Sequence, residues 1–280
     1  MMKVKRYLDE LSYCLQTGAT LSDKLRLGRA TIKFHASNIW QIRTSNDTHT
    51  LDHYRLHLKG KEFDLWLRTL GGDIFVFYEI FFDEVYRIPE TLYNNINNIH
   101  TVVDLGSNIG LTSLYFNSLF PNAKFICVEP NPYNLSVLQK NILSLRERAH
   151  ILDGAVSDHS GYQLFEAECH TWESKLSNNS RGNLRVRLYS MPEIISKFGL
   201  REISLLKIDI EGTEVDLLRN GADWLEIVNL IIIELHGEYS IDHLRTDIKR
   251  FGLEVYPPNA KLGNNMIVAT RAAKAGQGIH

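Results

Sequence analysis

The pattern of apolar positions changes along the chain and divides it into parts. Near the start, apolar residues recur every three or four positions, which predicts a helix over residues 4–17 and a short second helix at 22–27. Alternating runs follow and predict strands at 31–34, 39–42, 54–58 and 63–67. Lys59-Gly60-Lys61 separates the last two runs, which indicates a hairpin.

From residue 73 onward, helix-like segments alternate with short apolar runs, as in a doubly wound α/β fold. The runs that predict strands lie at 101–104, 124–129, 149–156, 161–168, 183–189, 204–209, 229–236, 253–256 and 265–269. Helices are predicted at 74–86, with Asp73 as its N-cap, and at 90–99, 111–120, 134–145, 191–198 and 241–251. We therefore expect an accessory α+β region at 1–72, a mostly parallel sheet within 73–271 and a flexible tail at 272–280.

The stretch 101–110 has the order of a buried strand, a glycine-rich turn and the start of a helix. That order is typical of a nucleotide pocket, because the turn and the helix N-terminus receive the ligand. Gly106 and Gly110 are separated by three residues, and Asp104 precedes the first glycine by two positions. A dinucleotide turn needs a third glycine against the pyrophosphate, and this turn lacks one.

A second carboxylate, Glu129, ends the next predicted strand. In a Rossmann-like unit this position hydrogen-bonds the ribose, and a carboxylate accepts from both hydroxyls at once. After the third predicted strand, small residues such as Ala155 leave room for an adenine ring, with Asp153 or a backbone group at its edge. The two acids together predict a nucleotide-type ligand more specifically than either alone.

Three stretches carry a family likeness: Val103-Asp-Leu-Gly-Ser-Asn-Ile-Gly110, Val128-Glu-Pro-Asn-Pro132 and Leu206-Lys-Ile-Asp-Ile-Glu-Gly-Thr-Glu214. They resemble motifs of the FkbM family of S-adenosylmethionine (SAM) methyltransferases. Ile232-Ile-Glu-Leu-His236 and Asn264-Asn-Met266 are similar to later parts of the family pattern. The resemblance extends over about residues 73–269 and is weak or absent over residues 1–65.

The resemblance implies a class I methyltransferase fold with a seven-stranded sheet, SAM as the cofactor, and methyl transfer to a hydroxyl of a sugar, glycan or secondary metabolite. Glu79, in the aromatic helix predicted at 74–86, is a candidate for the amino-acid end of SAM. The other expected SAM contacts are Asp104, Gly106, Ser107, Asn108, Gly110, Glu129, Pro130, Asn131, Asp153 and Ala155.

Four ionisable residues lie at or directly after the carboxyl ends of predicted strands and are candidates for the chemistry: Asp209, Glu211, Glu234 and His236. An aliphatic hydroxyl is a poor nucleophile at neutral pH, so a base or a metal is expected to assist. His236 has a suitable unperturbed pKa for a general base. The resemblance places Asp209 beside the transferred methyl group, and Glu234 can bind or orient the acceptor. Glu211 and Glu214 also suit the first turn of a helix.

A different interpretation makes the same four residues a site for Mg²⁺ or Mn²⁺. We assign no metal from the sequence, because carboxylates near a sulfonium do not require one. A polar loop at 173–182 is a candidate to close over the acceptor.

Composition restricts the class of protein. The chain has 280 residues, of which 44% are hydrophobic and 23% charged, with a net charge of -2. These values are typical of a globular protein and do not favour a nucleic-acid partner. A small-molecule or saccharide acceptor is what the resemblance implies. The scattered Cys14, Cys127 and Cys169 argue against disulfides and zinc, and fit a cytoplasmic location. We expect no secretory signal and no membrane span, and a homo-oligomer stays possible.

Two other functions remain open from the sequence. One is a non-catalytic SAM-binding or scaffold protein, in which residues 1–72 would be the working part. The other is a nucleotide-dependent oxidoreductase, which the missing third glycine of the turn disfavours.

Overall fold

A seven-stranded sheet forms the centre of the protein. The computed structural model describes residues 2–40, 50–69, 72–95, 98–165, 184–256 and 265–271. The strand order is β11-β12-β10-β9-β3-β4-β5; β12 runs antiparallel to β10 and β11, and the other neighbouring strands pair in parallel. The strands are β3 (Thr101–Leu105), β4 (Lys124–Glu129), β5 (Ala149–Asp153), β9 (Leu205–Ile208), β10 (Leu230–Glu234), β11 (Leu253–Val255) and β12 (Met266–Arg271). The doubly wound, mostly parallel sheet is confirmed.

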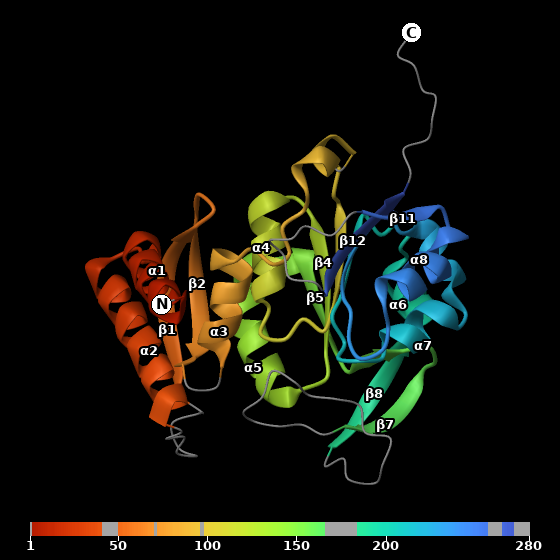
Figure 1. Cartoon of the computed structure of the whole chain (residues 1–280). Helices are drawn as coiled ribbons and strands as arrows, with labels where there is room; N and C mark the ends of the chain where they lie inside the picture. The colour runs from red at the N-terminus through yellow and green to blue at the C-terminus, as the bar shows by residue number, and fades with distance from the viewer. Residues whose placement is uncertain are drawn as a thin grey trace.

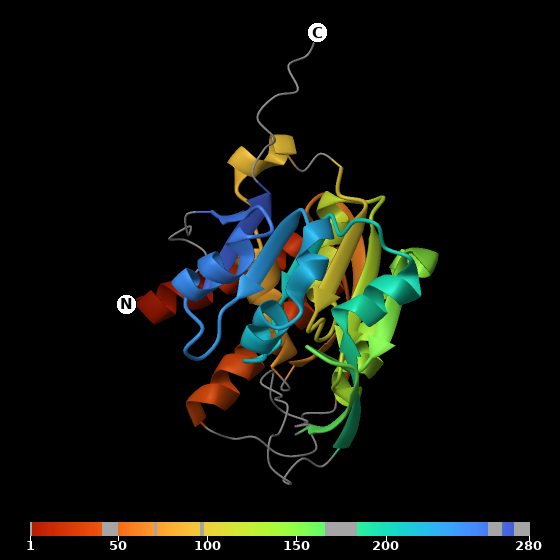
Figure 2. The ribbon, with the colours of Figure 1, turned by 90° about the vertical axis from the view of Figure 1, so that its right-hand side faces the viewer.

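Helices cover both faces of this sheet, which explains why its central strands are apolar runs without alternation. One face is covered by α4 (Leu111–Leu119) and α5 (Pro132–Asn141), and the other by α6 (Met191–Phe198), α7 (Glu214–Arg219) and α8 (Ile241–Lys249) (Figures 1 and 2). Short 3₁₀ segments join these elements at η5 (Ile142–Arg148) and η6 (Ala222–Ile227). Because the central strands run parallel, their carboxyl ends all lie at the same edge of the sheet.

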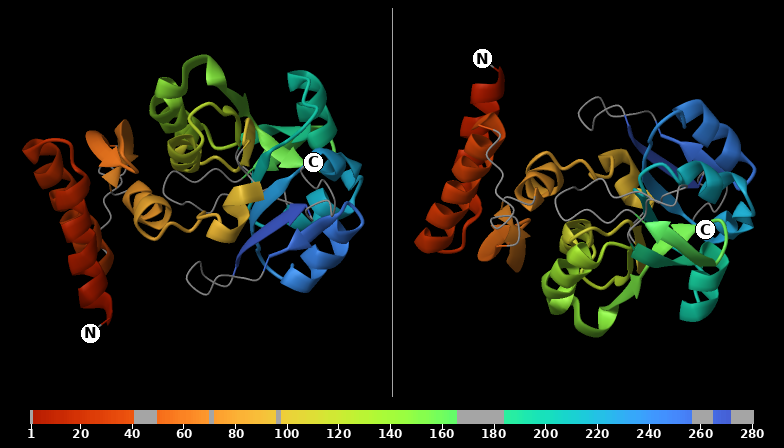
Figure 3. Two further views of the ribbon diagram at one scale, coloured as in Figure 1. Left: turned by 90° about the horizontal axis from the view of Figure 1, so that it is seen from above. Right: turned by 90° about the horizontal axis from the view of Figure 1, so that it is seen from below.

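The N-terminal region packs against the α4–α5 side of the molecule (Figure 3). It consists of α1 (Met2–Thr17), α2 (Leu21–Trp40) and the antiparallel hairpin of β1 (Leu51–Leu58) and β2 (Lys61–Arg68). The chain continues through α3 (Asp73–Phe77) and the π-helical turn η3 (Tyr78–Phe82). One hydrophobic cluster extends from Leu27 and Leu56 to Leu230 in the sheet. This continuity places α1 and η3 beside the strand ends.

The second helix is longer than the pattern predicts, and the strand expected at 31–34 is wrong. Leu27, Ala30, Thr31 and Phe34 are buried on one face of α2. Their spacing of three and four is helical, and the β-branched residues Thr31 and Ile32 made a four-residue window look like a strand. Residues 39–40 of the next expected strand also belong to α2, and residues 41–49 lie outside the described part.

Several boundaries also differ. Asp73 does not cap α3: Gly72 holds that position, and the Asp73 carboxylate instead accepts hydrogen bonds from the Arg68 backbone at 2.7 Å and its guanidinium at 2.9 Å. The helix expected to Tyr86 ends at Phe82, because Glu84 takes a positive φ of 53°. The segment expected as a helix at 90–99 is the 3₁₀ helix η4 (Glu90–Asn95).

The run at 149–156 also divides, at Gly154. Its second half, β6 (Ala155–Ser157), joins β8 (Leu184–Ser190) and β7 (Gly161–Phe165) in a separate sheet of order β6-β8-β7. The polar loop 173–182, Cys169 and the tail 272–280 lie outside the described residues.

Candidate functional site

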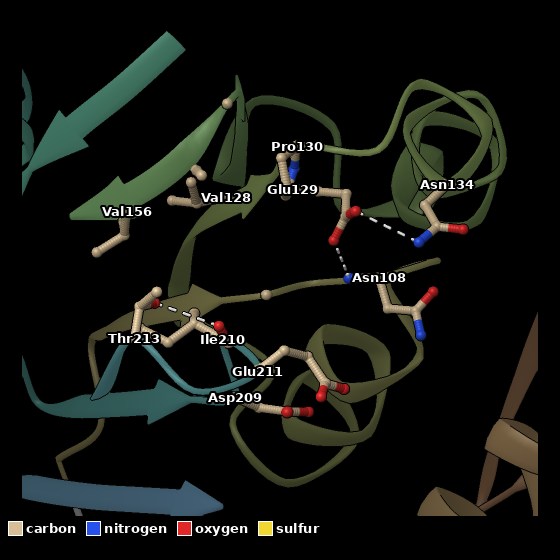
Figure 4. A pocket seen from close by; sticks show the side chains of 13 residues that line it. Asn108, Val128, Glu129, Pro130, Asn134, Val156, Asp209, Ile210, Glu211 and Thr213 are labelled. Atoms are coloured by element: carbon tan, nitrogen blue, oxygen red, sulfur yellow. Dashed lines mark hydrogen bonds between the residues drawn. The ribbon is translucent and has the colours of Figure 1, made fainter. Parts of the chain in front are cut away.

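Two adjoining hollows lie at the carboxyl ends of the parallel strands. The smaller, here called the narrow pocket, has a volume of about 70 Å³ and lies among the loops that follow β3, β4, β5 and β9 (Figure 4). The larger, the wide cavity, has a volume of about 700 Å³ and extends towards α1, α3 and η3. Gly106, Asn108, Asp209 and Glu211 line both hollows, so ligands in the two would meet there.

The loop after β3 forms the junction between the hollows. Gly106 has a φ of +73°, and a Cβ at this position would lie 1.8 Å from the backbone oxygen of Asp209. Only glycine therefore allows the loops after β3 and β9 to approach this closely. The backbone N–H groups of Gly106 and Ser107 donate to the carbonyl of Val128 at 3.0 and 2.9 Å. These bonds tie the loop to β4, which carries Glu129.

Glu129 is a buried carboxylate that faces the narrow pocket. It accepts hydrogen bonds from the backbone N–H of Asn108 at 2.8 Å and of Asn131 at 2.9 Å, and from the Asn134 amide at 3.3 Å (Figure 4). Burial raises the pKa of Glu129 to about 7, although these three donors favour the charged form. Glu129 therefore changes its charge near neutral pH, opposite Asp209 and Glu211.

Asp104 is fully buried and lines neither hollow. It stands opposite Lys207 in the register of β3 and β9, and its Oδ1 is 3.3 Å from Lys207 Nζ. Its Oδ2 accepts a hydrogen bond from Ser113 at 2.7 Å. Lys207 Nζ also donates to the carbonyl oxygens of Leu105 at 3.2 Å and Gly106 at 2.5 Å. The ammonium group thus joins both strands to the junction loop.

Asp209 follows β9 and is held by one of its two oxygens. Oδ2 accepts a hydrogen bond from the Tyr86 hydroxyl at 2.9 Å and lies 3.5 Å from Lys207 Nζ. Burial and the charge of Asp209 raise the pKa of Tyr86 well above its ordinary value, so Tyr86 remains a neutral donor. Oδ1 lies 3.9 Å from His236 Nε2, on the side of the wide cavity.

His236 is oriented by Glu214, a fully buried residue at the start of α7. The two side chains are 2.8 Å apart at His236 Nδ1, and this hydrogen bond is the main reason why the pKa of His236 rises to about 9. Glu211 and Asp209 add to the effect through their charges. At pH 7 the imidazole is therefore protonated, and it donates at Nε2 rather than accepts. His236 can act as the predicted general base only after it has lost this proton.

Carboxylates outnumber cations around the wide cavity. Burial raises the pKa of Glu79 to about 7 with help from the charges of Glu234 and Asp209, and burial likewise raises the pKa of Glu234. Such a lining favours a positively charged ligand over an anion. Asp209, Glu234 and His236 also offer ligand atoms within 4.8 Å of one another, so they could hold a metal ion. The acids that line the cavity are Glu79, Asp83, Asp209, Glu211 and Glu234, and the cationic side chains are Arg6, Lys207 and His236.

The structure brings most of the predicted site residues together. The narrow pocket is lined by Gly106, Asn108, Glu129, Pro130 and Ala155, and the wide cavity by Glu79, Ser107, Asp209, Glu211, Glu234 and His236. Four expected SAM contacts lie outside both hollows. Asp104 and Asn131 are buried, Gly110 is the N-cap of α4, and Asp153 is exposed at the end of β5.

Sequence reasoning missed Lys207 and Asn134 and gave Tyr86 no role. Lys207 did leave a signal, because it is the one charged residue in the apolar run of β9. Tyr86 and Asn134 left none, since their contacts depend on elements distant in the sequence.

A family model described as the methyltransferase FkbM domain matches residues 104–254, which is more than half of the chain. The chain belongs to the FkbM methyltransferase family. The matched segment begins at Asp104 and includes Glu129, Asp209 and His236, so it contains the narrow pocket and the strand ends. Methyl transfer is the activity of this family.

Curated relatives resemble this FkbM chain over part of their length. The AMB antimetabolite synthetase AmbE of Pseudomonas aeruginosa is 27% identical over 233 residues, which cover 67% of this chain and 11% of AmbE. The hexuronic acid methyltransferase AglP of Haloferax volcanii is 26% identical over 134 residues, or 48% and 55% of the two chains. The 2-O-methyltransferase NoeI of Sinorhizobium fredii is 26% identical over 153 residues, or 48% and 62%. The chain spans less than two thirds of each of these relatives.

Among solved structures, a methyltransferase FkbM from Methylobacillus flagellatus aligns with 96% of this chain and 60% of its own, at 12% identity and a TM-score of 0.46. Within the described ranges, no helix combines the length and the apolar character that crossing a bilayer requires.

We predict that Gly106→Ala separates the loops after β3 and β9. The added Cβ overlaps the Asp209 carbonyl, so the free energy of unfolding should fall by about 3 kcal/mol. Gly199→Ala is the matched control, since Gly199 also has a positive φ of 60° but no atom within 4 Å of the new Cβ. It should cost only about 1 kcal/mol. Equal losses in urea unfolding of the two variants would contradict the packing argument.

We also predict that the left-handed backbone of Glu211, with a φ of 56°, stores strain at the junction. Glu211→Gly and Glu211→Ala both remove the carboxylate, but only glycine relieves the backbone. The glycine variant should therefore be about 1 kcal/mol more stable and unfold about 2–4 °C higher than the alanine variant. Calorimetry of the two variants checks this, and identical melting temperatures would show an unstrained loop.

Proposed function

We propose that this FkbM chain is a SAM-dependent O-methyltransferase whose acceptor is a saccharide or another small molecule rich in hydroxyl groups. The observation that carries the proposal is the meeting of the narrow pocket and the wide cavity at Gly106, Asn108, Asp209 and Glu211. Similarity to AglP and NoeI supports it, since their names describe a hexuronic acid methyltransferase and a 2-O-methyltransferase.

The residues present fit SAM. In the narrow pocket, Glu129 is available to the ribose hydroxyls, and the apolar Val128 and Val156 flank the small Gly154 and Ala155 where an adenine ring would pack. The amino-acid end would pass Gly106 into the wide cavity, where carboxylates such as Glu79 can bind its ammonium group. An acid-rich lining also suits the positive charge of a sulfonium.

The chain positions an acceptor and receives its proton. Bound SAM supplies a methyl group on a cationic sulfur, which keeps the electron pair of the broken S–C bond as the new O–C bond forms. Asp209 Oδ1, Glu234 and Glu211 line the wide cavity and can accept hydrogen bonds from acceptor hydroxyls, and one carboxylate takes the proton. Tyr86 and Lys207 hold the Asp209 carboxylate in place, so this side chain is already positioned when an acceptor hydroxyl binds to it.

Calorimetric titration with SAM, S-adenosylhomocysteine and NAD⁺ tests the cofactor. We expect binding of the first two and none of NAD⁺; binding of NAD⁺ alone would favour the oxidoreductase. Release of S-adenosylhomocysteine with a panel of methyl glycosides and hydroxylated metabolites then tests turnover, with mass spectrometry of the product. SAM binding without turnover of any acceptor would favour the non-catalytic alternative.

We predict a pH dependence of cofactor binding from Glu129. Its pKa of about 7 means that the charged form, which accepts from both ribose hydroxyls, is present above pH 7 and lost as the pH falls. The dissociation constant of methylthioadenosine should therefore be about tenfold higher at pH 6 than at pH 8. This probe keeps the ribose but lacks the amino-acid end of SAM, so Glu79 does not contribute. Glu129→Gln should bind weakly at both pH values, and an unchanged slope in this variant would contradict the assignment.

A further inference from the structure

A histidine and two carboxylates from neighbouring strand ends converge in the wide cavity. Glu234 ends β10, and Asp209 follows β9 in the same parallel register, since Ile233 pairs with Ile208. His236 lies two residues beyond Glu234. The three side chains offer ligand atoms that all lie within 4.8 Å of one another. A nitrogen donor and two carboxylate oxygens at this spacing are a ligand set for a small divalent cation.

The orientation of His236 points to a ligand at its outer nitrogen. Its Nδ1 is bonded to Glu214, which has no exposed surface and is itself fixed by the backbone N–H groups of Ile210 at 3.4 Å and Gly212 at 3.2 Å. Glu214 lies outside the converging set and fixes the ring from behind. A carboxylate on the far nitrogen is the usual support of a metal-bound histidine, because it fixes the ring and its tautomer.

The distances in front of His236 are too long for hydrogen bonds. Nε2 lies 3.6 Å from Glu211, 3.9 Å from Asp209 and 3.9 Å from Glu234. Hydrogen-bonded ion pairs between these side chains would be close to 2.8 Å. Spacings of this size instead leave room for a shared ion, since two atoms that each bind it at about 2.1 Å lie about 3.0 Å apart on adjacent sides and about 4.2 Å apart on opposite sides.

The ligand oxygen of Asp209 is also set in advance. Tyr86 and Lys207 lie on Oδ2, and Oδ1 is the oxygen nearer to His236. The cavity of about 700 Å³ leaves space for water or acceptor hydroxyls as the remaining ligands.

We propose that Asp209, Glu234 and His236 bind one divalent cation, Mg²⁺ or Mn²⁺, in the wide cavity, and that the proton on His236 Nε2 is released to solvent as the ion binds. The role of the ion rests on the proposed function, because a hydroxyl bound to a divalent cation loses its proton more readily. Asp209, Glu234 and His236 then coordinate the ion. Glu211, which also lines the junction, can take the proton of the hydroxyl. The acceptor would bind through one or two hydroxyls, as a vicinal diol of a sugar can.

Titration of the full chain with Mn²⁺, followed by calorimetry and by electron paramagnetic resonance, tests the site. We expect one Mn²⁺ per chain, displaced by Mg²⁺, and a loss of affinity of at least tenfold in His236→Gln and in Asp209→Asn. His35→Gln is the matched control, because His35 forms the same kind of pair, 2.6 Å from the buried Glu10, outside the cavity. It should bind Mn²⁺ like the unmodified chain.

Titration with S-adenosylhomocysteine separates this inference from the proposed function and reports whether each variant folds. Cofactor binding without Mn²⁺ binding, or Mn²⁺ binding that survives both substitutions, overturns the metal site and leaves the methyltransferase proposal standing. Mn²⁺ binding that depends on His236 and Asp209, with no affinity for the cofactor, keeps the metal site and overturns the proposed function.

Discussion

One buried ammonium group holds the strand ends of this protein in place. Lys207 Nζ is surrounded by the carboxylates of Asp104 and Asp209 and by the carbonyl oxygens of Leu105 and Gly106. Removing an ammonium group from water costs several kcal/mol, and these four acceptors compensate for that loss. Because they belong to two strands and the loop between the hollows, the charge fixes their relative positions. The close approach of Gly106 to Asp209 is one result.

The protonation states of the other ionisable groups around the wide cavity follow from its excess of acidic side chains. Tyr86 stays neutral beside Asp209, His236 carries a proton beside Glu214, and Glu79 and Glu234 ionise less readily than usual. Each of these shifts has the same sign, since each reduces the negative charge that the cavity must hold. A sulfonium and a divalent cation would do so too, so the two proposals draw on one electrostatic cause.

The sequence was enough to predict the positions of Glu129, Asp209 and His236. A buried parallel strand appears as an apolar run, and polar residues directly after it must lie at the carboxyl edge of the sheet. Asp104 shows the limit of this rule. It precedes the last residue of β3, and its register partner Lys207 keeps it in the interior. Register between strands and contacts such as Glu214 with His236, from different elements, depend on the tertiary fold. The strand predicted at 31–34, within α2, was wrong for a local reason, because a four-residue window does not separate two periods.

The order of the strands has a consequence for how the chain acquires its structure. β12, the last described strand, is inserted between β10 and β11, although both of these precede it in the sequence. Until residues 266–271 are synthesised, the edge of β10 presents unpaired backbone groups along the apolar run Leu230-Ile-Ile-Ile233. Such an edge pairs readily with other chains. A nascent or truncated chain that lacks β12 would therefore already carry every residue of the proposed metal site, yet be prone to aggregation.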